Sequence, residues 1–205
     1  MMEPKFCSDY EARVRKFQSK MSPGSIFSSE NSRYHIGGYT KTPTGRIVRG
    51  GPISYPAIHP HAMARNLKFM KELGAMGENG EQSQVGKWKV MGLEHITLYV
   101  QSRFLWDADQ DVEQVLDEYC ALFYGPAAKA MKEAITYAEQ NLAFKDQSRG
   151  RGRGNPANVP LAVSLRFREL LENARQLASD TIYGKRIQAI LSELQPKDQL
   201  IEKHR

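Results

Sequence analysis

The apolar positions after Lys87 recur at intervals of three and four, the spacing that places residues on one face of an α-helix. Five such faces follow one another towards the end of the chain. In chain order they hold Leu93, Ile96, Thr97, Val100 and Phe104; Val112, Val115, Leu116, Tyr119 and Phe123; Met131, Ala134, Ile135, Ala138 and Leu142; Val163, Phe167, Leu170, Leu171, Ala174 and Leu177; Tyr183, Ile187, Ile190, Leu191 and Leu194. Successive amphipathic helices bury such faces against one another, so we expect a bundle of about five helices.

Sequence signals mark the boundaries of two of these helices. Asp111, followed three residues later by Gln114, fits a capping box, in which each side chain takes up one backbone N–H at the start of the helix. Gly125 ends this helix, and Pro126 opens the next because its missing N–H would have had no partner there.

The first 86 residues follow a different pattern. Residues 1–58 are rich in Gly, Pro and Ser and predict loops around short strands near 34–39 and 53–58. Met63, Leu67 and Met70 then predict a helix that stops at Gly74, and the short apolar piece AMGENGEQS follows at once. A strand, a helix and a strand in this order indicate a βα unit of a parallel sheet. The predicted fold is α+β and mostly α, with residues 1–86 forming the strand-bearing part and 87–205 the helical part.

The net charge of +6 first suggests a nucleic-acid partner. Residues 145–205, however, hold 12 Lys and Arg against 7 Asp and Glu, so nearly all of the excess lies in the last third of the chain. Part of it belongs to a basic Gly/Arg linker at 148–158, which carries no interleaved aromatic residues. We interpret the linker as a charged connection between helices and do not expect nucleic acid as the main partner.

Several classes of site lack their sequence signatures. Cys7 and Cys120 form no spaced pair, and no GxxxxGK[ST], GxSxG, HExxH or CxxC motif occurs. We therefore expect no disulfide framework, metal site or cofactor. There is no run of about 18 apolar residues and no signal-like N-terminus. The chain as it stands is thus expected away from membranes and in the cytoplasm, although a full-length parent could be exported.

The run GLEHITLYVQSRFLWDADQDVEQVLDEYCALFYGPAAKAMKEAI resembles the C-terminal part of a bacterial family of unknown function, whose members carry a barrel similar to α-glucuronidases and related glycoside hydrolases. The matching pieces are Leu105-Trp106-Asp107, the aspartates at 107, 109 and 111, the Leu-Asp-Glu-Tyr run at 116–119, and residues 123–128. The segments HPHAMARNLKFMKELGAMGENGE and LRFRELLENARQLASDTIYGKRIQAILSELQP are similar to the last helix and strand of that barrel and to its closing helices. The resemblance covers roughly residues 52–196.

This resemblance implies the last βα unit or units of a TIM-type barrel, followed by the bundle. A complete barrel takes about 250 residues, so most of its strands would have to come from a missing N-terminal segment or another chain. The helices that carry no chemistry would then support the barrel wall.

Glu78 and Glu81 are the candidate catalytic residues. If residues 75–77 end a barrel strand, both glutamates fall at the C-terminal face, where barrel enzymes place their reacting groups. Glycoside hydrolysis uses two carboxylates, and the partner of either glutamate would come from missing strands. The alternative is a solvated loop with two ordinary acidic residues.

Tyr55, His59, His61 and Trp88 are the candidate substrate-binding residues. The Tyr55 and Trp88 rings could stack on a sugar, and either histidine could hydrogen-bond a sugar hydroxyl or carboxylate. The alternatives are packing of Trp88 between helix and barrel, and turn or capping roles for the histidines. His59 and His61 alone do not make a metal site, because nothing near them has ligand spacing.

Two functions follow. The first is the C-terminal portion of a glycoside hydrolase-like protein of carbohydrate metabolism, inactive by itself. The alternative is a non-enzymatic basic helical module that binds an acidic partner such as nucleic acid.

Overall fold

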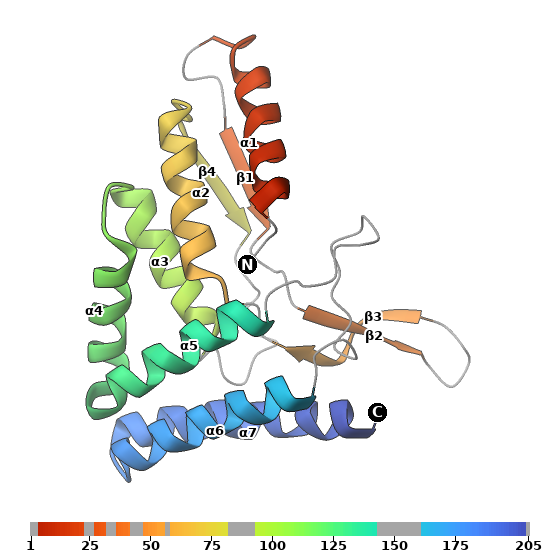
Figure 1. Ribbon diagram of the computed structural model, residues 1–205, viewed down its shortest axis with the longest axis vertical. Helices are drawn as coiled ribbons and strands as arrows, with labels where there is room; N and C mark the ends of the chain where they lie inside the picture. The colour runs from red at the N-terminus through yellow and green to blue at the C-terminus, as the bar shows by residue number, and fades with distance from the viewer. Residues whose placement is uncertain are drawn as a thin grey trace.

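The computed structural model describes residues 4–22, 27–31, 36–41, 47–55, 58–81, 93–142 and 161–203, over which the protein is mostly helical (Figure 1). The helices are α1 (Pro4–Gln18), α2 (Pro60–Glu72), α3 (Glu94–Trp106), α4 (Val112–Tyr124), α5 (Ala128–Leu142), α6 (Leu161–Ala178) and α7 (Ile182–Lys203), with a 3-10 turn at Gly125–Ala127. The five helices predicted after residue 87 are confirmed as α3 to α7. The basic linker lies outside the described residues. Among the helices described, none combines the length and the apolar content that crossing a membrane requires.

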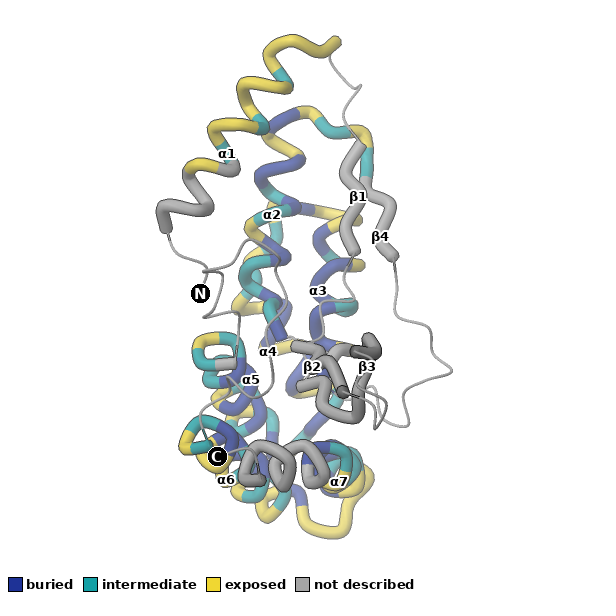
Figure 2. The backbone as a smooth tube through the Cα atoms, turned by 90° about the vertical axis from the view of Figure 1, so that its right-hand side faces the viewer, coloured by how far each residue is buried: buried dark blue, intermediate teal, exposed yellow. Residues whose placement is uncertain are grey.

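The predicted apolar faces form most of one continuous core. It runs from Ile58 through α2 and on to Leu194 in α7, and the buried positions follow the inner faces of these helices (Figure 2). The α2 residues Met63, Ala64 and Leu67 belong to this core, so the predicted helix before Gly74 packs on the bundle. One expected core residue is wrong: Leu177 is 60% exposed, because at the end of α6 it is Ala174 and Ala178 that lie inside.

The strands differ from the sequence-based prediction. They are β1 (Phe27–Asn31), β2 (Ile36–Lys41), β3 (Ile47–Tyr55) and β4 (Gly77–Glu81). β3 covers part of the segment expected at 53–58, but it pairs antiparallel with β2 and not with β4. The parallel partner of β4 is β1, from a segment that the sequence predicts as loop. Because β1 is polar in all but its first residue, its sequence resembles a loop more than a buried strand.

Helix α1 is a second element that the sequence analysis missed. It packs against the end of α2, where Arg15 pairs with Glu72 at 3.0 Å and Gln18 Nε2 donates to the Leu73 carbonyl at 3.3 Å. A small separate cluster of Phe69, Met70 and Leu73 lies at this contact, with Val14 and Ala75 packed against it.

Helices α1, α2 and α3 run in the same direction. Arg15 lies over the Phe69 ring, and Gln18, one turn later, reaches Leu73. On the other side, Lys68 lies over the Phe104 ring, and Lys71 pairs with Asp109. In both pairs, later residues of one helix meet later residues of the next. β1 follows α1, β4 follows α2, and β1 is parallel to β4, so parallel helices and parallel strands alternate here, except that the antiparallel β2–β3 hairpin stands between β1 and α2.

The boundaries of α4 follow the predicted signals. The Asp111 side chain accepts a hydrogen bond at 2.8 Å from the backbone N–H of Glu113, the residue before the expected donor Gln114. Gly125 ends the helix with φ +52°, and a Cβ built there would lie 2.6 Å from the Tyr183 ring of α7. Only glycine fits both the backbone and the ring.

Candidate functional site

The two candidate catalytic residues lie within β4, whose end at Glu81 replaces the expected end at Gly77. The register places Glu78 opposite Ser28 and Glu81 opposite Asn31. Neighbouring residues of a strand alternate between the two faces of a sheet, so positions three apart belong to opposite faces. Glu78 and Glu81 therefore occupy strand positions that belong to opposite faces.

The register also brings in a residue that the sequence analysis missed. Glu30 of β1 lies opposite Gly80, two positions along from the Ser28–Glu78 pair, and so shares a face with Glu78. No local sequence pattern predicts that β1 pairs with β4, so the sequence gives no signal that would have identified Glu30.

The candidate substrate-binding residues are placed differently from one another. Tyr55 is the last residue of β3 and pairs with Ile36. His59 precedes α2 as its N-cap residue, while Trp88 lies outside the described residues. His61, in the first turn of α2, has the best-defined surroundings.

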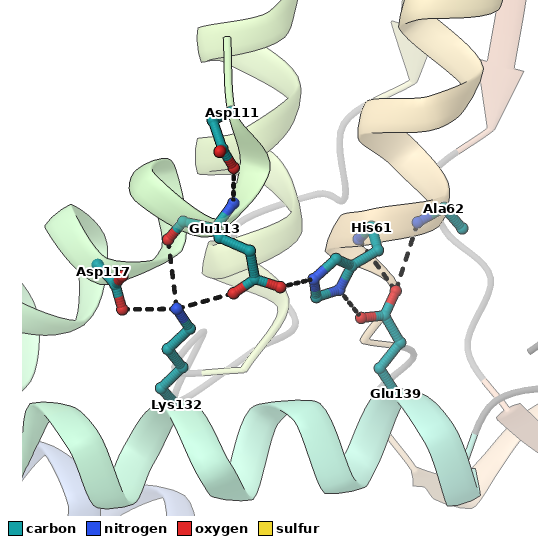
Figure 3. Close-up of polar contacts among 7 residues, drawn as sticks. All are labelled: His61, Ala62, Asp111, Glu113, Asp117, Lys132 and Glu139. Atoms are coloured by element: carbon teal, nitrogen blue, oxygen red, sulfur yellow. Dashed lines mark hydrogen bonds and ion pairs between the residues drawn. The ribbon is translucent and has the colours of Figure 1, made fainter.

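The His61 ring lies between two carboxylates from other helices (Figure 3). Its Nδ1 is hydrogen-bonded to Glu139 of α5, and its Nε2 lies 2.8 Å from Glu113 Oε1 of α4. The other carboxylate oxygen of Glu139 accepts the backbone N–H of His61 at 3.0 Å and that of Ala62 at 3.4 Å. Backbone N–H groups at a helix start have no partner within the helix. Glu139 therefore caps α2 from a separate helix.

Lys132 of α5 completes this arrangement from below in Figure 3. Its ammonium group is 2.8 Å from Glu113 Oε2 and 2.6 Å from Asp117 Oδ1, and it donates to the Glu113 carbonyl at 3.3 Å. We call His61, Glu113, Lys132 and Glu139 the His61 clamp. It joins α2, α4 and α5 through ion pairs and hydrogen bonds of these side chains.

The contacts of the clamp favour the protonated form of His61. The hydrogen bond to Glu139, opposed by partial burial and supported by the bond to Glu113, raises the pKa of His61 to about 9. The hydrogen bonds from Lys132 and then His61 lower the pKa of Glu113. At neutral pH the ring is therefore an imidazolium between two carboxylates.

This state determines what His61 can do. A protonated ring with both N–H groups engaged offers no lone pair to a proton donor or a metal ion. Throughout the part of the chain that the structure describes, no group of three or more His, Cys, Asp or Glu residues could hold a metal. A sugar contact by His61 would require one of its two bonds to open. In this state the clamp holds the start of α2 against α4 and α5.

Together these features define a helical bundle joined to a short segment of alternating helices and strands. Residues 51–136 match the family model of a domain of unknown function (DUF4838). The match begins within β3, ends within α5 and includes three of the four clamp residues, all but Glu139. Neither the curated proteins nor the solved structures gave a match.

Proposed function

We propose that this chain is the C-terminal portion of an α-glucuronidase-like glycoside hydrolase protein of carbohydrate metabolism, and that it is inactive by itself. In this proposal the β1–β4 pair with α1, α2 and α3 forms the last units of a TIM-type barrel, and α4 to α7 form the helical bundle that supports it. The substrate is a complex carbohydrate.

The observation that carries the proposal is the succession of parallel helices and two parallel strands from α1 to α3, in which the β2–β3 hairpin is an insertion between β1 and α2. Such units build barrel walls, and reacting groups of barrel enzymes stand where the strands end. Glu81 ends β4, and Glu30 lies one residue before the end of β1. Parallel strands are usually rich in Val, Ile and Leu, whereas β1 and β4 together contain one apolar side chain, that of Phe27. Polar residues in this place favour a site over a packed wall.

The His61 clamp supports a structural role for the bundle. In an alternating fold each helix begins at the edge of the sheet where the strands end, so the first turn of α2 stands at the proposed catalytic edge. Glu139 and Glu113 hold that turn from α5 and α4. The bundle thereby fixes the position of the first turn of α2.

Two measurements test the proposal. The purified chain should release no nitrophenol from a panel of nitrophenyl glycosides and α-glucuronides, because two strands do not enclose a sugar. A xylo-oligosaccharide bearing glucuronic acid should nevertheless shift the amide NMR signals of Tyr55, His59, Glu78 and Glu81. Turnover that is lost in Glu78→Gln would contradict the inactivity, and the absence of shifts at these residues would contradict the carbohydrate function.

A further inference from the structure

The C-terminal ends of α1, α2 and α3 expose apolar side chains. Nine large apolar side chains are exposed in the part of the chain that the structure describes, and five of them lie at or just beyond these three helix ends. They are Phe17, Met21, Met76, Leu105 and Trp106, of which Trp106 is 92% exposed. We call this surface the α1–α3 end face. Exposed apolar side chains that gather in one place mark a site of association, whereas scattered ones do not.

The three helix ends are neighbours in space. Arg15, near the end of α1, pairs with Glu72, the last residue of α2. Lys71, beside Glu72, pairs with Asp109 in the turn that follows α3. The His61 clamp holds the first turn of α2, so the end face stands at the other end of that helix. What binds here is therefore independent of the proposed catalytic edge.

Opposite charges flank the end face on its two sides. In α1 and the turn after it, exposed cations recur with the apolar side chains at the intervals of three and four that define one helix stripe: Arg13, Lys16, Phe17, Lys20 and Met21. The turn after α3 instead exposes three acidic residues next to Trp106, namely Asp107, Asp109 and Asp111. Neither Lys16 nor Asp107 forms an ion pair with another described residue, so both charges are available to a partner.

The three helix ends also form steps. Figure 1 shows that α1 reaches furthest, α2 less far and α3 least. Consider a two-fold axis that passes beyond the end of α2, perpendicular to the row of helices. Rotation about it sets the projecting end of α1 in each copy against the recessed end of α3 in the other. The same rotation brings the basic stripe of each copy to the acidic turn of the other.

From this match of charge and shape we propose that the α1–α3 end face joins two copies of the chain in a symmetric dimer. Phe17 and Met21 of α1 pack on the partner's Trp106. Lys16 faces the partner's Asp107. Any other partner would have to carry a basic and an acidic flank in the matching order, whereas a second copy supplies both. Because each copy contributes each flank once, the contact closes at two chains and builds no filament.

Sedimentation equilibrium of the full chain, from micromolar to millimolar concentration, tests for the dimer. The mass should rise from the 23.2 kDa of one chain to twice that value. Trp106→Ala should raise the dissociation constant by about tenfold or more, because aromatic side chains anchor such contacts. Leu122→Ala removes an exposed apolar side chain of α4 away from the end face and should leave the constant unchanged. A monomer at every concentration, equal effects of the two variants, or growth beyond two chains would overturn the proposal.

Charge reversal tests which surfaces meet. Lys16→Glu and Asp107→Lys should each weaken self-association by about tenfold or more, because each places like charges opposite one another at both contacts. An equal mixture of the two variants should associate again, since both contacts of the mixed dimer then join opposite charges. Both positions are exposed, and unchanged far-ultraviolet circular dichroism would show that the fold is kept. A mixture that associates no better than either variant by itself would overturn the pairing of α1 with the turn after α3.

Discussion

Glu139 holds His61 twice, once through the imidazole ring and once through the backbone N–H, although 78 residues separate the two. The side chain of Glu139 is 13% exposed, whereas that of Glu113 on the other side of the ring is 56% exposed. The two carboxylates therefore contribute unequally, and the inner one should dominate the stability of the clamp.

Replacing Glu139 by Gln should lower the free energy of unfolding by about 1–2 kcal/mol, because the amide removes the charge that faces the imidazolium. Glu133→Gln makes the same change on an exposed position of α5 and should alter it by less than about 0.5 kcal/mol. Urea denaturation of both variants measures the difference. Equal effects would mean that the clamp does not stabilise the fold.

The contribution of His61 should depend on pH in a definite direction. Because the pKa of His61 in the folded protein, about 9, lies above the ordinary histidine value of 6.5 expected in the unfolded chain, this stabilisation is fully present below pH 6.5 and is lost as the pH rises through about 9. The groups facing the ring are Glu139, Glu113 and, behind Glu113, Lys132. Thermal melts between pH 6 and pH 10 should show a steeper fall for the unmodified chain than for His61→Gln. Parallel curves would contradict the assignment.

Gly125→Ala should destabilise the protein by about 2–3 kcal/mol, from a strained backbone and from the collision with Tyr183. Gly74→Ala is the matched control. Gly74 also has a positive φ, of +69°, but a Cβ there meets nothing within 4 Å, so only the backbone cost of about 1 kcal/mol applies. Adding Tyr183→Ala to Gly125→Ala should relieve the collision but not the strain, which a double-mutant cycle by chemical denaturation measures.

Gly184→Ala should disturb the connection between α6 and α7 more than Gly125→Ala disturbs α4. A Cβ at 184 would lie 1.8 Å from the Ser179 carbonyl oxygen, a backbone atom that cannot turn aside, so we expect a loss of about 3 kcal/mol or more. Gln188→Ala, on the exposed side of α7, serves as the control in the same denaturation series. A native-like midpoint for Gly184→Ala would show that the turn relaxes without cost.

Cys120 should be inert while the protein is folded. Burial raises the pKa of its thiol to about 12, so almost no thiolate exists near neutral pH. In a Cys7→Ser background, a colorimetric thiol reagent should react with Cys120 orders of magnitude faster in urea than in buffer. Rapid reaction in buffer would indicate that α4 opens easily.

The sequence predicted those structural features that depend on residues close to one another along the chain. The helices from α3 to α7, the Asp111 cap and the Gly125 end all follow from residues within a few positions of one another. The partner of β4, the contacts of α1 and the His61–Glu139 pair depend on residues 50 or more positions away, and local patterns do not encode such pairings. Leu177 fits the helical spacing yet lies outside, because it stands at the edge of the predicted face, and Ala174 and Ala178 fill the buried positions at the end of α6.

Helix α2 contributes side chains both to the large core and to the small cluster at α1, so its two ends should open separately. The first half of α2 contributes Met63, Ala64 and Leu67 to the large core, and its second half contributes Phe69 and Met70 to the small cluster with α1. A cluster of so few side chains has little to resist thermal fluctuation, whereas the large core must open as a whole. The two ends of α2 should therefore exchange their amide hydrogens on different timescales. The end that the clamp secures would exchange slowly, and the end that meets α1 would exchange early.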